Sequence, residues 1–479
     1  MATSDSADGR FFARSLAGIA AVTLYRVAML PLARADLYTD DSQYWLWSRH
    51  LDWGYYSKPP LIAWIVHLST ALGGSDDPFW IRLPFPLIHA VTAVLVALIA
   101  RRLYGERIGG IVGFAYVGLP AVAVASFSLS TDTPMLCCFA LATLAYVHLT
   151  ERSSAGWALV LGAAIGFGML AKYAMIYFPL SAAVAAIVLP SARLAWRDVL
   201  FAAVPALVIL APNVAWNAEN GFATLHHTAD NTRLEQGAAI EPLELLDFWA
   251  GQFLIPGPIF FAGFLIGLRG VRRDRRTAFL ALMALPTLAI VSVQALLAGA
   301  QTNWAAAGHV AALVLGVAVV APHRRWLAAA LAINLAITAG LPVAAAFADR
   351  WTLGGSLVLA RYTGRSDLSR HAAEVARANG LDTLVSDSRA ILADFFYTLR
   401  DSGLALYAAP VEGFPPNHYV QKYPLPPGPG DVLLIGRPPV CRDPNVKPEL
   451  VASWTPASGY RTDEVEAFRV PRRCWFPGN

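Results

Sequence analysis

The segment Thr39–Pro60 reads TDDSQYWLWSRHLDWGYYSKPP and lies between two long apolar runs. It begins with paired aspartates, continues through aromatic residues, and ends on a lysine followed by two prolines. Such a segment is expected at a membrane surface, because amphipathic rings prefer the interface between lipid and water. There its carboxylates, rings and cation would face a ligand carried by the membrane.

The composition of the whole chain indicates a membrane protein. Of its 479 residues, 56% are hydrophobic and 15% are charged, which is too apolar for an ordinary soluble globule. The basic residues are mostly arginines that fall in short clusters between the apolar runs, and the net charge is +4. This distribution is typical of membrane topology and argues against a nucleic-acid partner.

Apolar runs close to the ~20 residues that cross a bilayer recur as far as residue 348. We therefore expect an all-α polytopic membrane protein with about eleven transmembrane helices. The predicted spans are residues 15–33, 79–100, 108–127, 133–149, 155–171, 173–190, 198–215, 247–268, 277–298, 305–321 and 326–348.

Arginine positions predict the orientation of these spans. The clusters follow alternate spans, at Arg101, Arg102 and Arg107, at Arg152, at Arg193 and Arg197, at Arg269–Arg276, and at Arg324 and Arg325. The positive-inside rule places these loops in the cytoplasm of a bacterium together with the N-terminus, which we interpret as a retained signal anchor in the inner membrane. The outward loops are then 34–78, 128–132, 216–246 and 299–304, together with everything after residue 350.

After residue 350 the composition changes to that of a small α/β domain. The patterns predict helices at 367–380 and 389–402, and strands at 383–385, 404–408, 431–436, 450–454 and 464–470. The predicted organisation is a transmembrane domain over residues 1–350 and a periplasmic α/β domain over residues 351–479. Cys441 and Cys474 both fall in the second domain, where an oxidising compartment permits a disulfide.

The aspartate pair has a structural and a chemical interpretation. Asp40 is suited to cap a helix, with Gln43 completing a capping box, and Asp41 suits a first helical turn. Alternatively, both carboxylates belong to a site.

The pattern of residues 42–51 predicts a short helix that lies in the membrane interface on its three rings, Tyr44, Trp45 and Trp47. A second helical pattern over 59–72 starts with proline and is too short to span.

Three further charged residues fall in the outward loops. Lys58 could belong to a site or could simply reach lipid headgroups with its amine. Asp132 could likewise belong to a site or could cap the helix that begins near Pro134. A carboxylate at the tight hairpin of two membrane helices is nevertheless a functional candidate by default. Lys172 ends the next outward hairpin, either as an interfacial anchor or as a second positive charge facing an anionic ligand.

The loop 216–246 contains His226, His227, Asp230 and Arg233. Adjacent histidines do not face one site from a regular helix, so the pair is a weak metal motif and solvated histidines are the more frequent case. The sequence therefore contains no clear set of ligands for a divalent metal. Arg233 would add positive charge for an acidic sugar or a phosphorylated acceptor.

Several motifs, and their order along the chain, resemble those of one family of membrane enzymes. They are the acidic pair at Asp40 and Asp41, Lys58-Pro59-Pro60, Arg82-Leu83-Pro84, Asp132, Pro212–Phe222 and Asn303-Trp304. Across roughly residues 10–350 the chain resembles the type C glycosyltransferases that use polyprenyl-phosphate sugars. It is similar above all to the bacterial aminoarabinose and galacturonic-acid transferases of lipid A and to protein O-mannosyltransferases.

The resemblance implies roles for individual residues. Asp40 would be the general base, with Asp41 and Asp132 as further catalytic carboxylates, and Lys58 would hold the donor phosphate. Gln43 and Ser57 stand where relatives usually carry arginine and glutamate, which removes a phosphate contact and a carboxylate. The remaining candidates are Tyr44, Tyr55, Arg82 and Lys172 for the donor phosphate or lipid, and His227, Arg233, Asn303 and Trp304 for the acceptor.

The implied function is inverting sugar transfer from a polyprenyl-phosphate donor to an envelope acceptor, either lipid A, lipopolysaccharide or another glycan, on the periplasmic face. A protein acceptor is an alternative. Transport of a lipid-linked sugar is another, favoured by Arg26 inside the first span, although that residue also suits a partner within the bundle. A membrane-anchored scaffold is the third, and it leaves loop 34–78 unexplained.

Overall fold

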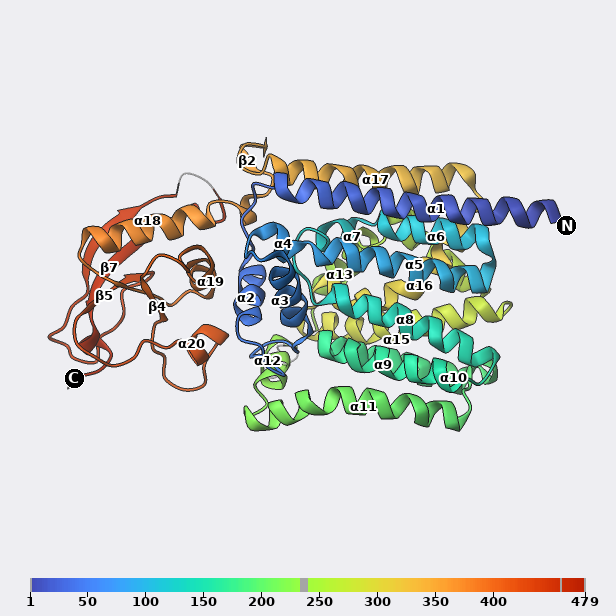
Figure 1. Cartoon of the computed structure of the whole chain (residues 1–479), viewed down its shortest axis with the longest axis horizontal. Coiled ribbons are helices and arrows are strands. Elements are labelled where there is room, and N and C mark those ends of the chain that lie inside the picture. The colour runs from blue at the N-terminus through green and yellow to red at the C-terminus, as the bar shows by residue number, and fades with distance from the viewer. Residues whose placement is uncertain (1, 233–239, 457–458, 478–479) are drawn as a thin grey trace.

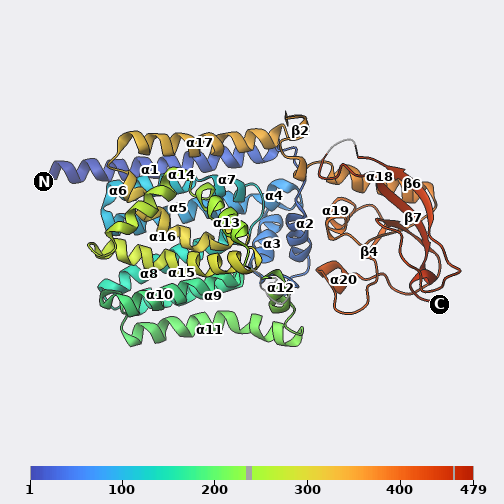
Figure 2. The ribbon, with the colours of Figure 1, turned by 180° about the vertical axis from the view of Figure 1, so that it is seen from behind.

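The computed structural model describes residues 2–232, 240–456 and 459–477. A bundle of long helices forms one part, and a sheet covered by helices lies beyond one end of it (Figure 1). The short helices α2 (Thr39–Ser48) and α3 (Leu61–Gly73) lie between these two parts, and the reverse view shows the same order of layers (Figure 2).

Within the described residues, seven helical segments are long and apolar enough to cross a membrane, or eight if one bent pair counts as a span. The seven are built from α1 (Ala2–Met29), α4 with α5 (Pro78–Arg82, Pro84–Tyr104), α8 (Asp132–Glu151), α11 (Trp196–Glu219), α15 (Arg275–Ala298), α16 (His309–Val320) preceded by a 3-10 turn, and α17 (Arg324–Ala346). α9 (Ala155–Ala171) and α10 (Tyr177–Val188) are shorter apolar helices.

Two predicted spans are not single straight helices. Residues 247–268 form α13 (Pro242–Leu254) and α14 (Pro258–Gly267), which meet at an angle of 106°. Residues 108–127 form α6 (Glu106–Val117) and the short α7 (Pro120–Ala125). Proline lacks a backbone donor and disfavours helical conformation in the residue before it, so Pro120 and Pro258 each start a new helix. The eleven crossings therefore stay a prediction.

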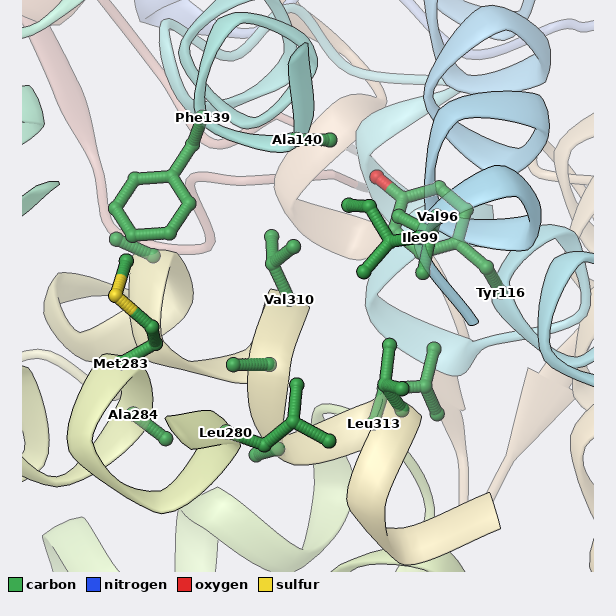
Figure 3. Close-up of a cluster of buried hydrophobic side chains, with 14 of the residues drawn as sticks. Val96, Ile99, Tyr116, Phe139, Ala140, Leu280, Met283, Ala284, Val310 and Leu313 are labelled. Carbon is green, nitrogen blue, oxygen red and sulfur yellow. The ribbon is translucent and has the colours of Figure 1, made fainter. Parts of the chain in front are cut away.

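The core of the bundle is apolar and closely packed around α5, α6, α8, α15 and α16 (Figure 3). Small residues permit close approach in places: a Cβ on Gly316 would lie 2.2 Å from the carbonyl oxygen of Phe260. Arg26 is 3% exposed and donates to the Val117 carbonyl at 2.7 Å. Its partner inside the bundle accounts for this charge within the first span.

The C-terminal part contains every helix and strand predicted for it, with ends shifted by up to four residues. A five-stranded mixed sheet has the order β4-β3-β5-β7-β6, in which β3 pairs in parallel with β4 and β5. The elements that were not predicted include α20 (His418–Lys422) and a hairpin of β1 (Thr352–Leu353) with β2 (Ser356–Leu357). The predicted ones are α18 (Arg365–Ala378), β3 (Thr383–Ser386), α19 (Arg389–Thr398), β4 (Ala405–Ala408), β5 (Asp431–Ile435), β6 (Glu449–Trp454) and β7 (Val465–Pro471).

The rings of α2 are packed against protein, so the expectation that they lie in the membrane interface is wrong. Trp45 makes an edge contact with Tyr397 of α19 at 5.0 Å between ring centroids. Trp47 stacks on Tyr55 at 4.6 Å. Tyr44, Trp45 and Trp47 are each at most 4% exposed, because the C-terminal part covers the face of α2 that the bundle leaves open.

Cys441 and Cys474 form a disulfide that closes a sequence separation of 33 residues. Replacing both with serine should lower the free energy of unfolding of the C-terminal part by about 3–4 kcal/mol, because the open chain regains loop entropy. Pulse proteolysis of the intact protein across a urea series measures the change.

The control for this experiment is the Cys137→Ser/Cys138→Ser pair, since both of these cysteines are free and lie in α8. Alkylation of Cys441 and Cys474 in the unreduced native protein would contradict the prediction.

Candidate active site

The N-terminus of α2 fixes Asp41 inside the protein. Its carboxylate accepts from the Leu129 amide at 2.9 Å, from Ser128 Oγ at 3.1 Å and from the Tyr38 amide at 3.3 Å. Tyr38 is the N-cap, so the predicted cap at Asp40 with Gln43 is wrong, and Asp41 takes the acidic position of the capping box. Burial raises the pKa of Asp41 to about 6, and the charge of Arg82 opposes this rise. Asp41 thus joins α2 to the hairpin before α8.

Asp40 points to a different side of α2 and is 41% exposed. It forms an ion pair with Arg389, the first residue of α19. The Arg389 Nε donates to Gln43 Oε1 at 2.9 Å. Residues three apart lie on one face of a helix, so Asp40 and Gln43 hold the same guanidinium between them.

Three hairpins at one end of the bundle meet at Asp132, the first residue of α8. Its Oδ1 accepts from Lys172 Nζ at 2.7 Å, and its Oδ2 accepts from Asn303 Nδ2 at 2.9 Å. Lys172 ends α9, and Asn303 belongs to the 3-10 helix Thr302–Gly308. The structure therefore brings together three residues that lie far apart in the sequence. As both oxygens are occupied by protein donors, Asp132 is held in one orientation.

Lys58 and Lys172 open into one cavity of about 300 Å³. Trp304 belongs to its mostly apolar wall, and the other lining residues are Ser57, Pro59, Tyr173, Ala174, Ile176, Tyr177, Thr224, Thr228 and Thr232. Burial lowers the pKa of Lys58, and the positive charge of Lys172 lowers it further, while Asp40 and Asp132 oppose the shift. Lys58 forms no ion pair with any residue that the structure describes, so its charge is available to an anionic ligand.

The other residues that were predicted to contact the sugar donor bind protein groups instead. Arg82 is 1% exposed and donates to the carbonyls of Ala35 and Asp36 at 2.7–3.3 Å. The Tyr55 hydroxyl donates to main-chain carbonyls and accepts from the Asp52 amide. Tyr44 is buried against Trp47, which raises its pKa well above the usual range. These contacts shape the walls of the site.

Among the predicted acceptor residues, His227 lies against the Tyr56 ring at 5.3 Å between centroids. Burial lowers the pKa of His227 to about 4, and the charges of Lys58 and Arg389 act in the same direction. Arg233 lies outside the described residues. Within the described part of the chain, no three or more His, Cys, Asp or Glu side chains are grouped as metal ligands.

A second ion pair is buried within the C-terminal part, where that part meets the start of α2. Arg365 Nη1 lies 3.2 Å from Asp394 Oδ2, and their side chains are 4% and 2% exposed. Arg365 also donates to Thr39 Oγ1 at 3.1 Å, and its amide donates to Asp36 Oδ2 at 2.9 Å. Burial raises the pKa of Asp394 to about 7, and the charge of Arg365 opposes the rise. This pair fixes α19, and with it Arg389, against α18, and the hydrogen bonds of Arg365 to Thr39 and Asp36 hold α18 against the start of α2.

Sequence reasoning missed Arg389 and Arg365. Both lie more than 320 positions from their partners in α2, at separations of 349 and 326 residues. The only signal was that a helix was predicted to start at residue 389, and nothing in the sequence indicated its partner.

Comparison with known proteins identifies the family of this chain. The lipid A galacturonosyltransferase RgtD of Rhizobium johnstonii is 37% identical over 464 residues, which cover 95% of this chain and 97% of that protein. The chain belongs to the type C glycosyltransferases. A family model described as dolichyl-phosphate-mannose-protein mannosyltransferase matches residues 57–216 of this type C glycosyltransferase, including the Lys58 loop, Asp132 and Lys172.

Solved structures of the type C glycosyltransferases share the fold. The structure of ArnT from Cupriavidus metallidurans bound to undecaprenyl phosphate matches with a TM-score of 0.65 at 16% identity, over 94% of this chain and 97% of that one. The apo structure of the same protein matches with a TM-score of 0.62. The chain is thus a membrane-embedded glycosyltransferase with an ArnT-like fold.

Arg365→Met should destabilise the protein by about 3–5 kcal/mol, because it leaves the Asp394 carboxylate buried without its partner. The double variant Arg365→Met/Asp394→Leu should recover most of that loss, since no uncompensated charge remains. Thermal unfolding in detergent measures both shifts.

Arg370→Met on the same helix is the matched control, because Arg370 and Asp367 form an exposed pair that contributes less than about 1 kcal/mol. Equal melting temperatures for Arg365→Met and Arg370→Met would contradict the proposed role of the buried pair.

Proposed function

We propose that this glycosyltransferase moves a galacturonosyl group from a polyprenyl-phosphate donor to lipid A, with inversion, on the periplasmic face of the bacterial inner membrane. The observation that carries the proposal is the cavity into which Lys58 and Lys172 both open, with the Asp40 charge near enough to act on Lys58. The name of RgtD supports the sugar and the acceptor. The undecaprenyl phosphate bound by ArnT supports the class of donor.

The proposed reaction needs a base and a cation near the anomeric carbon. An acceptor hydroxyl loses its proton to the Asp40 carboxylate while its oxygen forms a bond to the anomeric carbon. The bond from that carbon to the phosphate oxygen breaks, and the polyprenyl phosphate leaves with the electron pair. Lys58 stabilises the charge that develops on the departing phosphate. Asp132 acts as a positioning residue because it holds Lys172 at the cavity.

The proposed topology follows from the same site. The site lies at the end of the bundle that faces the sheet, and its residues are Asp40, Lys58, Asp132, Lys172 and Asn303. If arginine clusters mark the cytoplasmic side, this end faces outward, and we propose eleven crossings with a cytoplasmic N-terminus. The proposed boundary at residue 350 then separates the membrane domain from a periplasmic domain.

The direct test uses purified protein in detergent, polyprenyl phosphate carrying galacturonic acid, and lipid A. Mass spectrometry should detect lipid A that has gained one hexuronic acid residue. A protein that only moves a lipid-linked sugar across the membrane forms no such product in detergent. Failure to transfer to lipid A or any other envelope glycan would overturn the proposal.

Asp40→Asn should lower the rate of transfer by about 10²–10⁴-fold, because the amide keeps the shape of the side chain and cannot accept the proton. Single-turnover transfer with saturating donor measures the loss. Asp401→Asn is the control, since that side chain is 89% exposed in the C-terminal part. Transfer by Asp40→Asn at the wild-type rate would remove Asp40 from the role of base.

The lowered pKa of Lys58 predicts an alkaline limit to activity. Transfer needs the charged amine, so kcat/KM should fall as pH rises through a pKa below that of an ordinary lysine. Arginine stays charged in this range, so Lys58→Arg should move the falling limb to higher pH even if its maximum rate is lower.

Lys447→Arg is the matched control, because Lys447 is exposed and lies outside the site. If kcat/KM falls at the same alkaline pH in the wild type and in Lys58→Arg, a group other than Lys58 sets the alkaline limit.

A further inference from the structure

The guanidinium of Arg389 is held by α2 along one edge only. Its Nε donates to Gln43 and its Nη2 pairs with Asp40. Among the described residues, Nη1 has no hydrogen-bond partner, and the side chain is 41% exposed. The edge formed by Nη1 and Nη2 is therefore available and has the planar geometry that binds a carboxylate through two parallel hydrogen bonds.

The charges of the proposed donor require a second cation beside Lys58. A polyprenyl-phosphate uronic acid carries one negative charge on its phosphodiester and one on the sugar carboxylate. Lys58 opens into the cavity without an ion pair among the described residues and suits the phosphate. Lys172 is 17% exposed and paired with Asp132, which Asn303 also holds. Among the residues that the structure describes, Arg389 is thus a cation with an accessible edge for the second charge.

Arg389 also lies at the proposed site, because it pairs with Asp40, the residue proposed to act at the anomeric carbon. Its positive charge is among the causes that lower the pKa of Lys58, after burial and Lys172, and the pKa of His227, after burial and Lys58. The helix that carries Arg389 is fixed in place, because Asp394 on that helix forms the buried pair with Arg365. The guanidinium is therefore preorganised, so little conformational freedom is lost when a ligand binds.

We propose that Arg389 binds the carboxylate of the donor sugar and so selects a uronic acid over the matching neutral hexose. This inference rests on the proposed function and adds a residue from the C-terminal part to the donor site. Asp40 and Gln43 orient the bound edge of the guanidinium, and the sugar carboxylate occupies the free edge. The selectivity comes from a charge-assisted pair that a neutral sugar cannot form.

The test compares two donors that differ only in this charge. One is polyprenyl phosphate carrying galacturonic acid, and the other is the same lipid with the sugar carboxylate as its methyl ester. Dissociation constants are measured on the purified full-length protein by competition with a fluorescent donor analogue. The wild type should bind the acid about 10- to 100-fold more tightly than the ester. Arg389→Gln should reduce this ratio to less than about 3-fold while it leaves ester binding nearly unchanged.

Two further variants keep the test decisive. Arg389→Lys retains the charge without the planar fork, so it should keep an intermediate preference for the acid. Arg442→Gln removes an exposed arginine that pairs with Glu412 and should keep the wild-type ratio. Unchanged melting temperatures establish that each variant is folded. If Arg389→Gln does not fold, the ratio for Arg389→Lys decides, and a wild-type value there would overturn the proposal.

The outcomes separate this proposal from the proposed function. Equal weakening of acid and ester binding by Arg389→Gln would overturn it, because Arg389 would then act on the phosphate or on the structure. A wild type that transfers galacturonic acid without preferring the acid over its ester would overturn it as well. A wild type that binds the acid selectively through Arg389 but transfers nothing to any glycan would instead refute the proposed function.

Discussion

Charged side chains that are removed from water need partners, and this requirement determines how the two parts of the molecule meet. Arg365 and Asp394 are almost fully buried where the C-terminal part covers α2, and each would be costly alone. The Arg365 guanidinium also donates to Thr39 Oγ1, and the Arg365 backbone amide donates to Asp36. Moving the C-terminal part away from α2 would expose this pair, remove its hydrogen bonds to Thr39 and Asp36, and separate Arg389 from Asp40. The relative position of α19 and α2 is therefore defined by these polar contacts as well as by packed rings.

The candidate site is assembled from the ends of structural elements. The bundle supplies Asp132, Lys172 and Asn303 where its helices end, and the segment between α2 and α3 supplies Lys58. The apolar interiors of these helices carry little chemistry of their own. Their packing holds polar groups at one level of the bundle, as the proposed binding of a lipid-linked sugar phosphate requires.

The parts that were predictable from the sequence follow from local physical constraints. Bilayer thickness sets the length of apolar runs, so helices were found at every predicted span, and proline positions explain why 108–127 and 247–268 are broken. The convergence of Asp132 and Lys172 followed from their placement in neighbouring outward hairpins. Trp45 and Trp47 were misplaced because a ring buried against protein and a ring at a lipid surface look alike in a sequence. Arg389 was missed because its contact depends on tertiary packing across 349 positions.

That separation has a consequence for biosynthesis. A nascent chain that has completed α17 already contains the long apolar helices, α2, Lys58 and the Asp132 hairpins, and can enter the membrane. It still lacks α19, so Asp40 and Gln43 have no guanidinium between them. The site is therefore completed only when the last quarter of the polypeptide has been made and has folded against α2. Translation order thus delays the complete site until the end of synthesis.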